Sequence, residues 1–85
     1  MLSIKVLGTG CAKCHKLHAE AERALATAGL EATLEKVEGL DDIMAYGVMM
    51  TPALVIDEQV VSSGRLPSQA KLVSMLTSAA MAREG

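Results

Sequence analysis

The chain contains no Phe and no Trp, and Tyr46 is its only aromatic residue. The hydrophobic core must therefore be built from aliphatic side chains and methionine. Proteins that bind single-stranded nucleic acid stack its bases on aromatic rings, and this sequence does not supply them. Eight Lys and Arg residues against ten Asp and Glu residues leave a formal charge of −2, which offers no basic field to a polyanion. We therefore expect no nucleic-acid partner.

Long apolar runs are missing as well. Residues 53–56 form a wholly apolar run, but a membrane-spanning helix needs 18 or more such residues. The N-terminal residues do not combine a charged leader with an apolar stretch of about 7–15 residues, the pattern of an export signal. We expect a cytoplasmic protein with no membrane partner.

Nothing in the sequence divides the chain. The 85 residues suffice for one small domain, and no repeat, low-complexity tract or linker interrupts them. Hydrophobic residues make up 51% of the chain and charged residues 21%, a balance that excludes intrinsic disorder. Residues 1–85 are therefore predicted to form a single domain, and we expect it to act as a monomer.

Hydrophobic periodicity predicts alternating strands and helices. A strand, a crossover helix and a second strand pair in parallel with a right-handed crossover, and a later hairpin adds antiparallel strands. The predicted fold is an α/β three-layer sandwich, a four-stranded mixed sheet with helices on both faces. The expected elements are strand 2–7, helix 12–28, strand 30–37, helix 41–46, strand 53–56, strand 59–61 and a last helix capped by Ser68.

Methionine is expected to replace the missing Phe in the core. Its flexible side chain fills irregular gaps between other apolar residues. The methionines at apolar positions of the pattern are Met44, Met49, Met50 and Met75.

Cysteine is scarce, but the two cysteines stand close together. Cys11 and Cys14 form a C-x-x-C pair between the first strand and the first helix. Backbone N–H groups at the start of a helix lack internal partners and carry about half a positive charge, so they favour a thiolate. We expect the pKa of Cys11 to be lowered, which makes it the nucleophile. Cys14 falls on the apolar stripe of the helix, where burial disfavours the charged form and suits a resolving thiol.

Three other interpretations use the same residues. Cys11 to His15 match the C-x-x-C-H pattern of covalent haem attachment, but the chain lacks aromatic residues to line a haem cavity. Cys11, Cys14, His15 and His18 fall on one helix face and could bind zinc or copper(I), although one short helix cannot easily surround an ion. Both cysteines could also be small buried hydrophobic residues. A metal-binding or metal-carrier module is the main alternative.

A second motif lies far from the cysteines in the sequence. Residues 50–57, which include Thr51-Pro52, and residues 64–68 before the last helix accompany Thr9-Gly10-Cys11-Ala12-Lys13-Cys14. Together these segments resemble the small redox-active disulfide proteins of the thioredoxin superfamily. The resemblance covers essentially the whole chain.

This resemblance implies a thiol–disulfide oxidoreductase that has no bound cofactor. Cys11 would be the nucleophile and Cys14 the resolving thiol, and Pro52 would follow a cis peptide bond and face the pair. Gly10, Thr51 and Pro52 would contact the substrate through their backbone. The implied partners are protein disulfides and a reductase or thiol donor of unknown identity.

The sequence also departs from better-known relatives. Thioredoxins typically carry Gly-Pro between the cysteines and Trp before them, whereas this chain has Ala12-Lys13 and Gly10. The loop 62–65 lacks the Gly-Gly…Asp feature with which glutaredoxins bind glutathione. Thioredoxin's reduction potential and the glutathione dependence of glutaredoxins are therefore not carried over to this chain.

Overall fold

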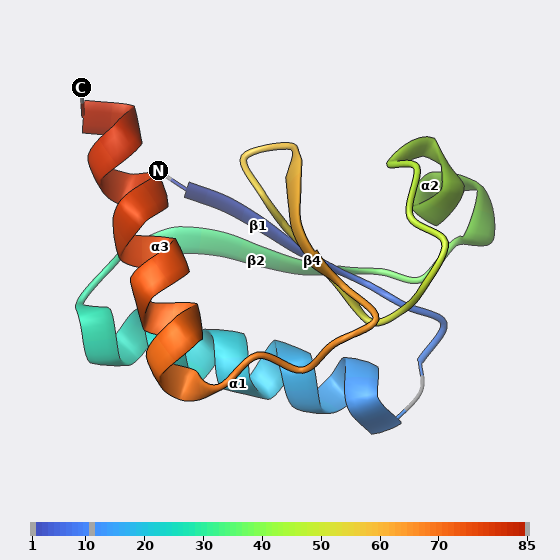
Figure 1. Ribbon diagram of the computed structural model, residues 1–85, viewed down its shortest axis with the longest axis horizontal. Coiled ribbons are helices and arrows are strands. Elements are labelled where there is room, and N and C mark those ends of the chain that lie inside the picture. Colours follow the sequence, from blue (N-terminus) through green and yellow to red (C-terminus); the bar gives the residue numbers. More distant parts are fainter. Residues whose placement is uncertain (1, 11, 85) are drawn as a thin grey trace.

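The predicted order of strands and helices is confirmed. The computed structural model describes residues 2–10 and 12–84, and Figure 1 shows the arrangement of their elements. No helix in these two ranges is both long and apolar enough to cross a membrane. The elements are β1 (Leu2–Leu7), α1 (Ala12–Ala28), β2 (Ala32–Val37), α2 (Leu40–Ala45), β3 (Ala53–Ile56), β4 (Gln59–Ser63) and α3 (Gln69–Glu84).

The four strands form one mixed sheet in the order β2-β1-β3-β4. β1 and β2 are parallel, with Leu2 opposite Ala32, and α1 makes the crossover between them. β3 runs antiparallel to β1 and β4. All four residues of β3 are buried, as expected for an apolar strand inside the sheet.

The larger core lies on the face of the sheet that α1 and α3 cover. The two helices cross at the lower left of Figure 1. Period-2 alternation in β1 points every second side chain at these helices, and the 3.6-residue period of α1 supplies the matching stripe. Its members are Leu2, Ile4, Val6, Leu17, Ala24, Leu25, Leu54, Ile56, Leu72 and Leu76.

The opposite face of the sheet has a smaller apolar cluster of Leu7, Ile43, Ala53 and Val55. Of the described helices, α2 covers it, and α2 lies apart from the other two in Figure 1. Ile43 is the buried residue of this short helix.

A polar trio of Lys5, Tyr46 and Glu58 lies beside this cluster: Tyr46 packs against it, and Lys5 is opposite Val55 in the sheet. Lys5 Nζ donates to Tyr46 Oη at 2.8 Å and to Glu58 Oε1 at 2.6 Å. The Tyr46 hydroxyl donates to Glu58 Oε2 at 2.9 Å. The hydrogen bond to the Glu58 carboxylate, followed by the one to Tyr46, raises the pKa of Lys5 above its usual value. The same bond from Lys5 lowers the pKa of Glu58.

Local features of the sequence mark the start of α3 and the turn between β3 and β4. The Ser68 hydroxyl accepts a hydrogen bond from the N–H of Lys71 at 3.2 Å, which confirms its role as the cap of α3. Asp57 and Glu58 connect β3 to β4 with φ of 49° and 68°. Two left-handed residues in a two-residue loop match the twist of a hairpin. Asp57 Oδ1 accepts from the N–H of Ser3 at 3.0 Å, which fixes this turn against β1.

The expectation that methionines fill the core is wrong for three of the four. Met44, Met49 and Met50 are exposed, Met49 to 97%, whereas Met75 packs half-buried against the larger core. Met44 lies on the outer side of a helix that contributes only Ile43 to the core. Met49 and Met50 stand in the loop before Pro52, where no element covers them.

Candidate active site

Cys14 lies in the first turn of α1 and faces the sheet. It is only 5% exposed, and it begins the buried stripe that continues with Leu17 and Ala21. Cys11, predicted as the nucleophile, lies outside the described residues. Its place in the sequence is between Gly10, which has a φ of +87°, and Ala12, the first residue of α1.

Gly8 brings the two sequence motifs together. It follows β1, and its N–H donates to the carbonyl of Val37 at 3.0 Å. A methyl group on Gly8 would overlap Cys14 Sγ, and it would stand 3.0 Å from Cys14 Cβ and 3.9 Å from Thr51 Cβ. The sulfur of Cys14 therefore occupies the space where another residue would place its Cβ, and Thr51 lies at the edge of that space.

The Thr51-Pro52 segment is held in place from its other side. The Thr51–Pro52 peptide bond is cis, the isomer that the resemblance implied. Pro52 is buried while Thr51 is exposed, and the Pro52 carbonyl accepts a hydrogen bond from the N–H of Gly64 at 2.9 Å. Met50 lies against Gly64, because a methyl group there would be 3.0 Å from Met50 Cβ. The exposed Thr51 thus stands beside a buried thiol.

Charged side chains surround the thiol end of α1. A small cavity of about 10 Å³ beside Cys14 is also lined by His15, Lys36 and Glu38, among other residues. This volume suits about one water molecule. Lys36 Nζ lies 3.3 Å from His15 Nδ1, and Glu38 Oε2 lies 3.5 Å from where a Cβ on Gly10 would stand.

The first turn of α1 adds only positive charge. It carries the exposed side chain of Lys13 and no acidic residue, and Lys16 follows on the next turn. Unpaired N–H groups and nearby cations both stabilise a thiolate over a thiol. Glu38, in the lining of the cavity beside Cys14, adds a negative charge that acts in the opposite direction.

The histidines of the alternative metal site are engaged elsewhere. His18 Nδ1 lies 3.0 Å from Glu22 Oε1 one turn along α1, and His15 faces Lys36. Among residues 2–10 and 12–84, no three His, Cys, Asp or Glu side chains gather in a way that could hold a metal ion. The contribution of Cys11 to such a site lies outside the described residues.

Comparison with known proteins identifies the family. A family model described as a thioredoxin domain matches residues 2–77. The chain belongs to the thioredoxin family. A thioredoxin of Methanothermobacter thermautotrophicus is 32% identical over 77 residues, which cover 91% of this chain and 100% of that protein. A thioredoxin of Methanocaldococcus jannaschii is 31% identical over 78 residues, covering 92% and 90% of the two chains.

A solved structure agrees with the thioredoxin fold. The crystal structure of Deadhead, a germline-specific thioredoxin of Drosophila melanogaster, superposes with a TM-score of 0.65. The aligned region covers 91% of this chain and 79% of the Deadhead chain. The sequence identity is 16%, so the similarity concerns the fold. Membership in the thioredoxin family supports a thioredoxin-like function for this chain.

Sequence reasoning found part of this site. Cys14 and Thr51 both lie near the position that a Cβ on Gly8 would take, and the Thr51–Pro52 bond is cis. The contact between Gly8 and Cys14 was not predicted; Gly8 stands between the expected strand 2–7 and helix 12–28. Gly8 is needed there for packing, because the sulfur leaves no room for a Cβ. The charged neighbours Lys36 and Glu38 carried no signal, since they lie more than 20 residues from Cys14 in the sequence.

Proposed function

We propose that the protein is a thiol–disulfide oxidoreductase that uses Cys11 and Cys14 as a redox-active dithiol. The observation that carries this proposal is the meeting of Cys14 Sγ and Thr51 at Gly8. A thiol in the first turn of a helix beside the exposed Thr51 suits exchange with a disulfide in another polypeptide. Its partners would be protein disulfides, and it would act in the cytosol as a monomer.

In the first step, the Cys11 thiolate attacks one sulfur of the partner's disulfide. A bond forms between Cys11 and that sulfur, and the bond between the two partner sulfurs breaks. The other partner sulfur leaves with the electron pair as a thiolate and takes a proton from water. The unpaired N–H groups at the start of α1 and the cations near it favour the attacking thiolate.

In the second step, Cys14 loses its proton to solvent and attacks Cys11 of the mixed disulfide. The bond between Cys14 and Cys11 forms, and the partner's remaining sulfur leaves as a thiolate. The partner gains two electrons, and the protein becomes a disulfide. A second dithiol, from a reductase or thiol donor, returns the two electrons by the same exchange in reverse.

Gly10, Thr51 and Pro52 would bind the partner's backbone beside the reacting sulfurs. Thr51 is exposed next to Cys14, and Pro52 is fixed beneath it by the bond from Gly64. An extended partner segment can pair with such an exposed backbone. This holds the partner's disulfide close to the attacking sulfur, which converts a bimolecular encounter into a positioned reaction.

The proposal is tested by trapping the mixed disulfide. Cys14→Ser cannot resolve the intermediate, so it should accumulate a covalent adduct with a peptide disulfide, visible by mass spectrometry under non-reducing conditions. Cys11→Ser should form little adduct, because the remaining thiol is buried. Equal adduct formation by both variants would show that the assignment of Cys11 as the nucleophile is wrong. No adduct with either variant would refute the exchange.

Two solution measurements complete the test. The alkylation rate of Cys11 in Cys14→Ser should report a pKa below the usual value of about 8.5 for a free cysteine. The reduction potential of the Cys11–Cys14 pair then decides which direction of exchange the cytosol permits. A Cys11 pKa at or above the usual value would contradict the role given to the helix start.

A further inference from the structure

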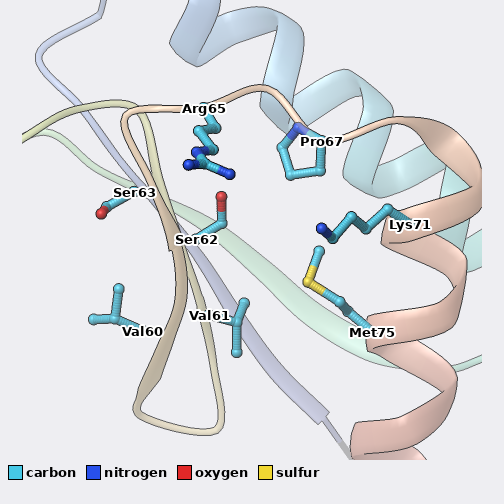
Figure 2. Close-up of a pocket in the computed structure, with 8 residues that line it drawn as sticks. All are labelled: Val60, Val61, Ser62, Ser63, Arg65, Pro67, Lys71 and Met75. Atoms are coloured by element: carbon cyan, nitrogen blue, oxygen red, sulfur yellow. The ribbon is translucent and has the colours of Figure 1, made fainter.

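A groove separates β4 from α3 on the outer side of the molecule. Its volume is about 540 Å³, large enough for several residues of a peptide. Figure 2 shows Arg65 reaching into the groove from the loop after β4 and Lys71 reaching into it from α3. Val61 and Ser62 of β4 also line the groove, and Met75 faces the same space from α3.

Both charges in the groove are positive. No Asp or Glu is among its lining residues, and within residues 2–10 and 12–84 neither Arg65 nor Lys71 has an ion-pair partner. Lys5, in contrast, is paired with Glu58 on the other side of the sheet. The chain as a whole has a formal charge of −2, but these two unpaired cations give the groove a positive potential. A positive potential attracts a carboxylate.

The wall formed by β4 is an edge strand of the sheet. β4 pairs with β3 alone among the described strands, and none of its five residues is charged. β2 at the opposite edge carries Glu35 and Lys36, the kind of residues that discourage pairing with another chain. Val60 and Val61 are each 40% exposed. An edge of this composition is a template for an extended segment.

A bulge interrupts the pairing of β4 with β3. Leu54 faces Ser62 and Val55 faces Val60, so Val61 is an extra residue in β4 with no counterpart in β3. The extra residue of a bulge stands outside the ladder. The Val61 side chain points toward the groove in Figure 2, which adds an apolar side chain to its lining.

The groove begins where the candidate active site ends. Arg65 follows Gly64 directly, and Gly64 donates its N–H to Pro52 and packs against Met50. A polypeptide that places a disulfide beside Thr51 has its flanking residues within reach of this junction. The same partner can therefore contact both places.

We propose that the groove between β4 and α3 binds an extended acidic segment of the partner protein that flanks the disulfide presented to Cys11 and Cys14. This inference rests on the proposed function for the identity of the partner, but the binding itself requires no exchange chemistry. Carboxylates of the segment pair with Arg65 and Lys71, and its apolar atoms contact Val61 and Met75. The groove thereby selects among disulfides by the residues beside them.

The binding test uses two peptides without cysteine, one containing several Asp and Glu residues and the other Asn and Gln at the same positions. Binding is followed by fluorescence anisotropy and by amide chemical shifts of the labelled protein. The acidic peptide should bind about three- to tenfold more tightly at low salt, and 0.5 M salt should remove the difference. The shifts should concentrate at residues 60–65.

Three single variants identify the cations responsible. Arg65→Gln and Lys71→Gln should each reduce the preference for the acidic peptide, and the double variant should abolish it. Arg23→Gln removes one exposed cation from α1 away from the groove and should keep the preference. Unchanged thermal unfolding of each variant excludes a folding defect. Equal losses in Arg23→Gln and Lys71→Gln would show a general charge effect and overturn the site.

Other occupants give different results. Glutarate that competes at the same concentration as the acidic peptide would show a site for small anions and overturn the segment. Dimerisation in sedimentation experiments that Val61→Lys abolishes, without peptide binding, would assign the edge to a second copy. If the peptide binds but no mixed disulfide is trapped, the groove stands and the proposed exchange fails. If exchange proceeds with no preference for acidic flanks, the groove assignment fails alone.

Discussion

The two faces of the sheet solve the same burial problem in different ways. One face is covered by the long helices α1 and α3, and its core is wholly apolar. The other is covered by α2, six residues long, and beyond Ile43 it relies on the trio of Lys5, Tyr46 and Glu58. Adjacent residues of β1 show the contrast, because Ile4 is fully buried while Lys5 forms hydrogen bonds.

The difference shows what a short helix can and cannot do. A helix of six residues presents less than two turns to the sheet, so it cannot shield a full strand from water. The chain places its only aromatic residue at the end of that helix and connects it to β1 and to the β3–β4 turn through polar atoms. A long side chain such as Lys5 covers apolar surface with its stem and keeps its charge at the edge.

The largest effect is expected from the covered face. Leu72→Ala removes a fully buried side chain between α3 and the sheet. The lost apolar contact and the cavity left behind should reduce the free energy of unfolding by about 2–5 kcal/mol. Urea denaturation measures the loss. Met44→Ala, at an exposed position, is the control and should change stability by less than about 0.5 kcal/mol.

A smaller and more local effect is expected from the other face. Ile43→Ala removes the one side chain by which α2 is buried. We expect a loss of about 2 kcal/mol, the lower end for such a substitution, because little structure beyond α2 depends on it. Amide hydrogen exchange should accelerate in residues 40–47 before it does in α1. Equal acceleration in both helices would show that the two faces unfold as one unit.

Removing one hydroxyl tests the polar trio. Tyr46→Phe keeps the ring beside Lys5 but deletes the bonds with Lys5 and Glu58. The expected loss of stability is about 1 kcal/mol or less, since the trio is partly open to water. Thermal unfolding at low and high salt measures it. If Tyr46→Phe costs as much as Ile43→Ala, the polar trio stabilises this face as strongly as its apolar cluster does.

How much of this could be predicted depends on the range of the signals. The limits of α1 follow from its apolar stripe and from Gly29, and the structure has both ends where the sequence places them. β2 begins at residue 32 rather than 30, because the N–H of Leu30 bonds to the carbonyl of Leu25 and closes α1. α2 begins at residue 40 rather than 41, since its N-cap is Gly39, which has no capping side chain to mark the start.

Features built from distant residues could not be predicted in the same way. Lys5, Tyr46 and Glu58 are 12 to 53 residues apart, and only the rarity of Tyr46 drew attention to one of them. β4 extends to residue 63, beyond the predicted 61, because the bulge at Val61 changes the alternation that marks a strand. The exposed Met49 has the same apolar character as a core residue, so composition alone could not place it.

The smallest effect concerns the pH dependence of the polar face. The pKa of Glu58 is lower in the folded chain than the ordinary value of 4.5, so its contribution to stability is complete above about pH 4.5. That contribution is lost as the pH falls through the folded pKa, because the protonated carboxyl no longer accepts from Lys5. The pKa of Lys5 is raised above 10.5, so the contribution of Lys5 to stability is lost only in strong alkali.

Urea denaturation of the wild type and of Glu58→Gln should therefore give different free energies of unfolding at pH 7, and the difference should shrink toward pH 3. Glu31→Gln, exposed and outside the trio, should show no such convergence. A difference that persists at pH 3 would mean that Glu58 acts through its left-handed turn position rather than through its charge.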